Sequence, residues 1–199
     1  IALEGRIVIE KAIQSKVKLE ALVCIEDRAA EWRARANGEY PVFPMKNEEI
    51  GALLGFKFHH GAIALARRPH MLDTAAMPHT GAWLCLWETT DPSNVGALIR
   101  TATGFGAMGV LVGPRCADPF YRKALRTSMG NSLATPIYSC SYDELADLSR
   151  AGFSLTAASL SKNAVSLRHF TPAYPLVLIV GNEGYGLPAE VLNLCSGEV

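Results

Sequence analysis

The chain has 199 residues, of which 49% are hydrophobic and 19% are charged, and its 19 basic side chains are balanced by 19 acidic ones. This composition excludes an intrinsically disordered chain, and the length suffices for one large hydrophobic core or two small ones. A net charge of zero argues against a protein that coats nucleic acid without specificity, although it leaves room for a local basic patch.

Targeting segments and metal sites are not expected from this sequence. Charged residues, glycine or proline interrupt every apolar run, so that none reaches the roughly 20 residues that a membrane span needs. The first ten residues include Glu4, Arg6 and Glu10 and do not resemble a signal peptide. The five cysteines are scattered, without a Cys-x-x-Cys pair. We expect a soluble, cytoplasmic protein with reduced structural thiols and with no membrane or metal partner.

The first 70 residues alternate between helical and extended segments and predict a small α/β domain. The pair Asn37-Gly38 should end the second helix, because both residues tolerate the left-handed conformation. Helices are expected over 5–14, 27–36 and 47–54, and strands over 19–25, 41–45 and 60–66.

Periodicity is lost between residues 67 and 81, where Pro69, Pro78 and Gly81 interrupt the pattern. We assign residues 71–81 to a linker between a domain over 1–70 and a domain over 82–199. There are 11 basic and 9 acidic residues before His70, and 8 basic and 10 acidic residues after it. The first part is therefore slightly basic, with a charge of +2, and the second has a charge of −2.

The second part of the chain predicts a parallel sheet covered by helices. Four continuous apolar runs, at 83–87, 108–112, 153–158 and 176–180, have the pattern of strands that are buried on both faces. Ligands bind at the loops that follow such strands in open parallel sheets. The residues after the first and the last of these runs are therefore candidates for a site.

The segment 91–106 follows the first of these runs and predicts a helix. Asp91 or Ser93 can cap it, and Pro92 suits its first turn. A glycine costs about 1 kcal/mol in a helix, so Gly96 indicates close approach by a ligand or by another backbone. Arg100 lies one turn after Gly96 and can reach a phosphate. A capped core helix with a surface arginine explains the same residues equally well.

The segment 176–188 consists of an apolar strand followed by a loop with three glycines in six residues. Gly181, Gly184 and Gly186 permit close approach of a ligand to the backbone, but their order matches neither the dinucleotide fingerprint nor a P-loop. The polar pair Asn182-Glu183 lies within this loop at the carboxyl end of the strand. That position favours a binding or catalytic site over a plain turn.

Together, Asn94-x-Gly96-x-x-x-Arg100 and Gly181-Asn182-Glu183-Gly184-x-Gly186-Leu187 resemble the motifs of the SpoU/TrmH family of RNA ribose 2'-O-methyltransferases, within the SPOUT superfamily. The motifs match in order and in separation. The first 70 residues are similar to the L30e-like substrate-binding domain that many members carry. The resemblance implies an α/β fold with a knotted (SPOUT) parallel-sheet domain, S-adenosylmethionine as cofactor, and a homodimer.

The resemblance also implies residue roles. Arg100, Asn94 and Glu183 would be the catalytic residues, with Arg100 orienting RNA phosphate, since a guanidinium stays protonated and is a poor base. The cofactor would be bound by Gly181, Leu160, Ser159, Asn182, Gly186 and Leu187. The backbone of the RNA would contact the basic cluster Arg115, Arg122, Lys123 and Arg126. The segment 128–131 resembles a further family segment near the pocket, although the end of a helix explains it as well.

The family has a third motif, a proline-containing strand followed by a Ser-Leu-Asn helix, and nothing after Leu187 matches it. We therefore expect the methyltransferase domain to be incomplete at its C-terminus in this sequence. The predicted activity is methyl transfer from S-adenosylmethionine to a ribose 2'-hydroxyl, with ribosomal RNA favoured as substrate. The alternatives are methylation of transfer RNA, or a non-catalytic RNA-binding or ribosome-assembly protein on the same fold.

Overall fold

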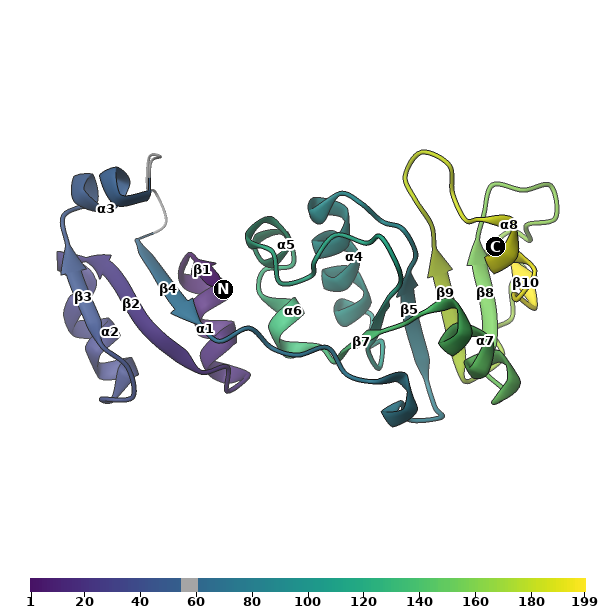
Figure 1. Ribbon diagram of the computed structural model, residues 1–199, viewed down its shortest axis with the longest axis horizontal. Coiled ribbons are helices and arrows are strands. Elements are labelled where there is room, and N and C mark those ends of the chain that lie inside the picture. The colour runs from purple at the N-terminus through teal and green to yellow at the C-terminus, as the bar shows by residue number, and fades with distance from the viewer. Residues whose placement is uncertain (55–60) are drawn as a thin grey trace.

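The computed structural model of the protein describes residues 1–54 and 61–199, which form two sheets with their helices (Figure 1). The first sheet has the strand order β1-β4-β2-β3, in which β3 runs parallel to β2 and the other pairs are antiparallel. We call this part the N-terminal unit. Its elements are β1 (Ala2–Glu4), α1 (Arg6–Gln14), β2 (Leu19–Ile25), a 3-10 turn (Glu26–Arg28), α2 (Ala29–Ala36), β3 (Val42–Met45), α3 (Asn47–Leu54) and β4 (Ala62–Ala66).

The elements predicted for this unit are present with small shifts. The predicted helix over 27–36 begins as a 3-10 turn and becomes α-helical at Ala29. It ends at Asn37 and Gly38, whose φ angles of 45° and 81° are left-handed, as expected for these residue types. The predicted strand over 60–66 begins at Ala62, and His60 lies outside the described residues.

The second sheet is entirely parallel, in the order β10-β8-β9-β5-β6-β7. The four predicted strands are all present in it, and the last of them, Leu176–Val180, has the predicted bounds. We call this part the C-terminal unit. Its elements are β5 (Ala82–Leu86), α4 (Pro92–Gly104), β6 (Val110–Val112), α5 (Arg122–Thr127), α6 (Asn131–Ala134), β7 (Ile137–Ser139), α7 (Tyr142–Arg150), β8 (Ser154–Ala158), β9 (Leu176–Val180), α8 (Ala189–Leu192) and β10 (Gly197–Glu198).

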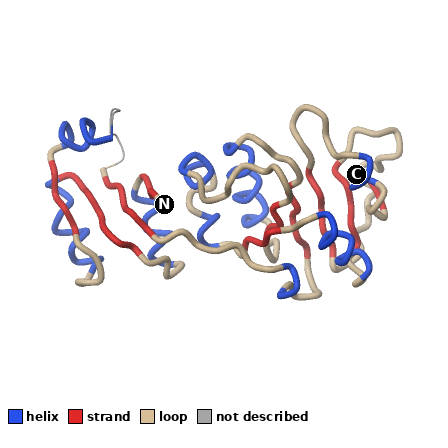
Figure 2. The backbone as a smooth tube through the Cα atoms, viewed as in Figure 1, coloured by secondary structure: helices blue, strands red, loops and turns tan. Residues whose placement is uncertain are grey.

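Alternate residues of β5 face two different cores. Leu84 and Leu86 pack in the cluster that contains Val95 and Ile99 of α4, and this cluster continues into the N-terminal unit. Trp83, Cys85 and Trp87 belong to a second cluster with residues of α7 and α8. Figure 2 shows the helices distributed on both sides of this sheet. Strands covered on both faces explain why the sequence shows continuous apolar runs instead of alternation.

The stretch predicted as a linker packs against the C-terminal unit. Leu72 pairs with Tyr138 of β7 in a parallel bridge, with the Leu72 amide donating to the Ile137 carbonyl at 2.7 Å. The 3-10 turn Thr74–Ala76 follows, and Met77 is buried in the second cluster. The connection between the two sheets is therefore held by backbone hydrogen bonds and by apolar burial.

The two units contact each other through α1 and β1 on one side and α5 and α6 on the other. Gly130, between α5 and α6, has a φ of +79°, and a Cβ there would lie 2.9 Å from Cβ of Lys11 in α1. The segment 128–131 thus lies where the units meet. None of the helices in the described part of the chain is long and apolar enough to cross a membrane.

Candidate functional site

A cavity of about 570 Å³ lies at the carboxyl edge of the parallel sheet. The carboxyl ends of parallel strands lie at the same edge, so residues following β5, β8 and β9 converge there. Helix α4 supplies Asn94 and Leu98 from the side. The cavity is lined by Thr89, Asn94, Leu98, Ala158, Ser159, Leu160, Val180, Gly181, Asn182, Glu183, Gly184, Tyr185, Gly186, Leu187 and Leu192.

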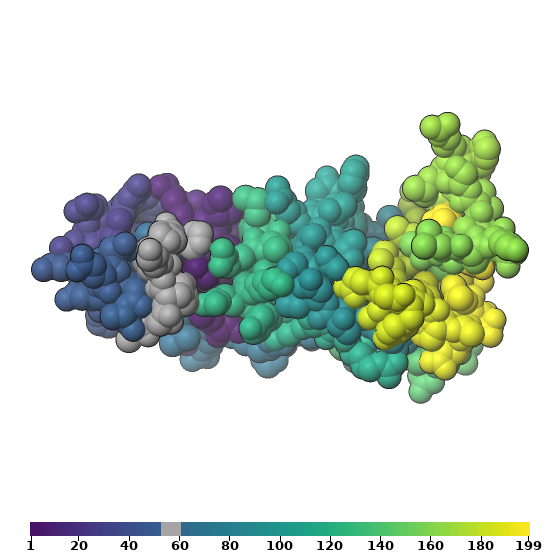
Figure 3. All heavy atoms as spheres, turned by 90° about the horizontal axis from the view of Figure 1, so that it is seen from above, coloured from purple at the N-terminus to yellow at the C-terminus, as the bar shows by residue number. Residues whose placement is uncertain are grey.

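The structure brings together all six residues that the sequence assigned to a cofactor. Ser159 and Leu160 follow β8, and the other four belong to the loop after β9. Leu160 is fully exposed at the rim, at the start of a segment that carries the exposed Val165 and Leu167. Figure 3 shows this light green segment projecting at the end of the molecule away from the N-terminal unit. The roles of these residues in binding stay predictions.

Asn94 and Glu183 meet at the cavity, although 89 residues separate them in the chain. Nδ2 of Asn94 donates to Oε1 of Glu183 at 3.0 Å. Asp91 caps α4 by accepting from the Ser93 amide at 2.7 Å, with Pro92 in the first turn, and this cap fixes the position of Asn94.

The Glu183 side chain keeps its charge in this environment. Partial burial works to raise the pKa of Glu183, but the Asn94 amide and the backbone amides of Glu183, Asp91 and Thr90 outweigh it. The pKa of Glu183 therefore lies below its ordinary value. The cavity presents an ionised carboxylate at neutral pH.

The loop after β9 is a tight turn that Asn182 organises. Asn182 and Gly186 exchange backbone hydrogen bonds of 2.9 and 3.0 Å. Oδ1 of Asn182 accepts from the Gly184 amide at 2.8 Å, and Nδ2 donates to the Glu88 carbonyl at 2.8 Å. A Cβ on Gly181 would lie 2.5 Å from the Gly186 carbonyl, so glycine is required there. Both polar ends of the Asn182 side chain thus hold the loop in place.

Glu88, Arg115 and Tyr185 form a cluster next to this loop that the sequence did not single out in full. Glu88 is only 3% exposed and has a φ of +55°. The Tyr185 hydroxyl donates to Oε2 of Glu88 at 2.6 Å, and Arg115 pairs with Oε1. Arg115 was assigned to RNA, but in this structure its guanidinium is an ion-pair partner of Glu88. The only sequence signal for Glu88 was its place at the carboxyl end of a buried strand.

The glycine of the first motif is explained by helix packing. A Cβ on Gly96 would collide with Oγ1 of Thr127 and with the Ala124 carbonyl, both of α5. Of the two explanations that the sequence left open, close approach by another backbone is therefore correct.

Arg100 lies one turn further along α4, is exposed, and does not line the cavity. Within residues 1–54 and 61–199, no hydrogen bond or ion pair engages its guanidinium. The structure thus brings Asn94 and Glu183 together but leaves the third residue of the predicted catalytic set outside the cavity.

Three of the four predicted RNA-binding residues share a surface recess. Arg122, Lys123 and Arg126 line it with Tyr121 and Thr127, and its volume is about 580 Å³. Arg122 and Arg126 also approach the buried carboxylate of Glu4 at 3.8 and 3.5 Å. Arg115 does not line this recess.

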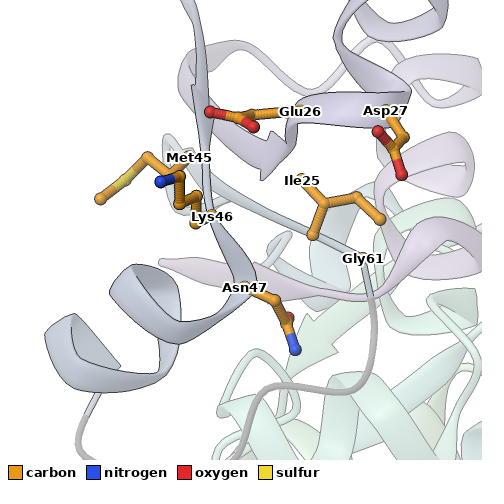
Figure 4. A pocket seen from close by; sticks show the side chains of 7 residues that line it. All are labelled: Ile25, Glu26, Asp27, Met45, Lys46, Asn47 and Gly61. Carbon is orange, nitrogen blue, oxygen red and sulfur yellow. The ribbon is translucent and has the colours of Figure 1, made fainter.

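A further cavity lies away from the predicted site residues. A cavity of about 500 Å³ in the N-terminal unit is lined by Ile25, Glu26, Asp27, Met45, Lys46, Asn47 and Gly61 (Figure 4). None of the residues singled out from the sequence lines it. No group of three or more candidate metal ligands occurs in the described part of the chain. Interaction with Cys140 and burial raise the pKa of the Cys85 thiol, in keeping with a structural role.

Comparison with known proteins identifies relatives that span the chain. The family model of the SpoU rRNA methylases matches residues 81–199. An uncharacterized tRNA/rRNA methyltransferase of Mycobacterium bovis is 33% identical over 201 residues, which cover 96% of this chain and 69% of that protein.

Solved structures match the same fold. The AdoMet-bound rRNA methyltransferase from Sinorhizobium meliloti superposes with a TM-score of 0.86 at 24% identity, covering 99% of this chain and 76% of that one. A structure described as an RNA 2'-O ribose methyltransferase superposes with a TM-score of 0.83 at 25% identity, covering 100% and 78% of the two chains.

Proposed function

The chain belongs to the SpoU rRNA methylase family, and from that membership we propose that it transfers a methyl group from S-adenosylmethionine to a ribose 2'-hydroxyl of RNA. The observation that carries this proposal is the cavity at the carboxyl edge of the sheet, where Asn94 holds the ionised Glu183. Support for the 2'-hydroxyl as acceptor comes from the similar protein described as an RNA 2'-O ribose methyltransferase.

The residues of the cavity fit S-adenosylmethionine. Its volume of about 570 Å³ is in the usual range of small-molecule sites. Leu98, Val180 and Leu187 offer apolar contact for an adenine ring, and Glu183 offers a carboxylate to a cationic ligand. The Thr89 hydroxyl is buried beside the cavity without a hydrogen-bond partner among the described residues, so a ligand can supply one. The Sinorhizobium meliloti protein was solved with this cofactor bound.

When bound, S-adenosylmethionine would supply an electrophilic methyl group on its sulfonium, which the ribose 2'-oxygen would take as it gives up its proton. The chain contributes chiefly by holding the reacting groups in line, since a sulfonium leaves without acid catalysis. Asn94 keeps the Glu183 carboxylate fixed, and the turn held by Asn182 sets where Glu183 lies. We assign Glu183 the role of orienting the 2'-hydroxyl, accepting its hydrogen bond and taking its proton as the oxygen is methylated.

Arg100 is assigned to the phosphate of the substrate RNA. Its guanidinium is exposed and available for a bidentate contact, and it lies on the same helix as Asn94. The role of a base is excluded because an arginine side chain stays protonated in water. We favour ribosomal over transfer RNA as the substrate, with the name of the matching family model as support. The homodimer and the cytoplasmic location stay predictions.

The first test measures methyl transfer. Purified protein, S-adenosylmethionine with a labelled methyl group and ribosomal RNA should give RNA whose methylated linkage resists alkaline hydrolysis, because the 2'-oxygen is blocked. Cofactor binding is measured separately by calorimetry. Absence of cofactor binding at millimolar concentration would defeat the proposal and favour a non-catalytic RNA-binding protein.

Substitutions test the assigned roles of Arg100 and Glu183 separately. Arg100→Ala should lower the methylation rate by about 100-fold or more while leaving the calorimetric affinity for the cofactor unchanged. Glu183→Gln should lower the methylation rate while leaving the affinity for RNA unchanged. Arg168→Ala, at another exposed arginine, is the matched control and should methylate normally. Unchanged activity of Arg100→Ala would show that the assignment of Arg100 is wrong.

A further inference from the structure

The recess lined by Tyr121, Arg122, Lys123, Arg126 and Thr127 combines an aromatic ring with three cationic side chains. Tyr121 immediately precedes α5 and is 58% exposed. An exposed ring beside cations has the composition of a surface that binds single-stranded nucleic acid. The recess of about 580 Å³ gives that composition a concave shape.

Two of the three cationic side chains of the recess, Arg122 and Arg126, lie close to a buried carboxylate. Glu4, whose side chain is 2% exposed, lies 3.5 Å from Nη1 of Arg126 and 3.8 Å from Nε of Arg122. Both arginine side chains still expose nearly half of their surface, at 46% and 47%. Arginines that are already ordered lose less conformational entropy when they bind a phosphate.

Lys123 connects the recess to the cavity at the sheet edge. Its Nζ lies 3.2 Å from Oδ1 of Asp91, in an exposed pair that a phosphate can replace at little cost. The same Asp91 caps α4, and Asn94 in the first turn of that helix donates to the Glu183 carboxylate at 3.0 Å. The first turn of α4 therefore connects Lys123 of the recess to Glu183, the residue that we assign to the reacting ribose.

We propose that this recess binds one unpaired nucleotide of the substrate RNA, adjacent to the nucleotide that is methylated. The base stacks on the ring of Tyr121, and the phosphate takes hydrogen bonds from Lys123 and the two arginines. A base within a double helix is stacked on its neighbours and does not present its face to a side chain, so the site selects single-stranded or loop RNA. This inference rests on the proposed function, because it takes RNA as the substrate.

The test compares two RNA probes with two variants of one residue. Fluorescence anisotropy gives the Kd for an end-labelled single-stranded oligouridine of about ten nucleotides and for a blunt-ended RNA duplex without unpaired nucleotides. Tyr121→Leu should weaken binding of the oligouridine by about 5- to 150-fold, the range of stacking on one aromatic side chain. It should change binding of the RNA duplex by less than twofold. Tyr121→Phe keeps the ring and should bind both probes like the wild type.

Tyr142→Leu is the matched control, since Tyr142 is also exposed but lies in α7, away from the recess. A second readout places 2-aminopurine in the oligonucleotide, whose fluorescence should be quenched by the wild type and by Tyr121→Phe but not by Tyr121→Leu. Oligouridine binding by Tyr121→Leu that equals the wild type, or an equal loss of binding to the RNA duplex, would overturn the stacking site alone. Failure of the wild type to bind any RNA would overturn the proposed function as well.

Discussion

Glu183 is ionised because a single amide and a few backbone groups offset the cost of its partial burial. Asn94→Ala removes the side-chain donor and leaves the desolvation, so the pKa of Glu183 should rise. In the wild type the lowered pKa stabilises the fold above the ordinary pKa of a glutamate, and this contribution is lost as the pH falls through the folded-state value. In Asn94→Ala this contribution should be smaller, and its loss should be complete at a higher pH. Carbon-13 NMR titration of the Glu183 carboxyl measures the shift.

Asn193→Ala provides the comparison for that titration, because Asn193 lies in the turn after α8 and makes no hydrogen bond to Glu183. Its Glu183 titration curve should overlay that of the wild type. A curve for Asn94→Ala that also overlays the wild type would show that the backbone amides alone hold the charge.

The pair of Glu88 and Tyr185 shows why part of the site escaped sequence reasoning. Both residues lie beside recognisable motifs, but 97 positions separate them, and only the pairing of β5 with β9 brings them together. Gly181, Asn182 and Glu183 were found because glycines and polar residues directly after an apolar strand form a local signal. The buried carboxylate of Glu88 has its hydrogen-bond partner, Tyr185, far away in the sequence, so it leaves no such local signal.

Helices α4 and α5 pack so closely at Gly96 that a methyl group has no room. Gly96→Ala should lower the free energy of unfolding by about 1–3 kcal/mol, even though alanine favours the helix, because the neighbouring Ala124 carbonyl is backbone and cannot move aside. Denaturant unfolding followed by circular dichroism measures the change.

Gly104→Ala tests the same substitution at the end of the same helix, where nothing lies within 4 Å of the added Cβ. It should leave stability unchanged or raise it by up to about 1 kcal/mol through helix propensity. Equal effects of the two substitutions would contradict the packing explanation.

The length of the apolar run, more than that of the strand itself, decided which strands could be predicted, since β6 has only three residues but lies in the apolar run 108–112. The bounds of Leu19–Ile25 and Leu176–Val180 were predicted because each is a run of five or more mostly apolar residues. The strands β1, β7 and β10 have only three, three and two residues. Runs this short carry no periodicity, so their pairing depends on partners that lie far away in the sequence.

At the scale of the whole molecule, Glu4 joins the two units by pairing with Arg122 and Arg126 across their contact. Glu4→Gln should lower the free energy of unfolding by about 1–3 kcal/mol, because two guanidiniums lose a buried partner. Glu20→Gln, which breaks the exposed pair with Arg67, should cost less than about 1 kcal/mol. Thermal unfolding of both variants measures the difference, and equal effects would show that Glu4 does not join the units energetically.

The relation between the units was the part of the architecture that the sequence predicted least. Loss of periodicity between residues 67 and 81 indicated a linker, and nothing local showed that Leu72 pairs with Tyr138. The packing of α1 against the C-terminal unit requires glycine at position 130, because a Cβ there would lie 2.9 Å from Cβ of Lys11. In the sequence Gly130 looks like an ordinary turn glycine. Composition and residue spacing predict the elements of each unit, whereas the contact between the units depends on the steric fit of their surfaces.

The strand order of the parallel sheet determines when each pair of strands can form during synthesis of the chain. Ala82 of β5 pairs with Leu176 of β9, which the ribosome adds about 90 residues later. At a synthesis rate of roughly 5–20 residues per second, one edge of β5 stays without its neighbour for about 5–20 seconds. The N-terminal sheet is complete by Ala66 and can form during that delay. The central strand pair, which carries Glu88 and the Glu183 loop at its end, is therefore assembled late, and the cavity can bind a ligand only after residues 176–187 have emerged.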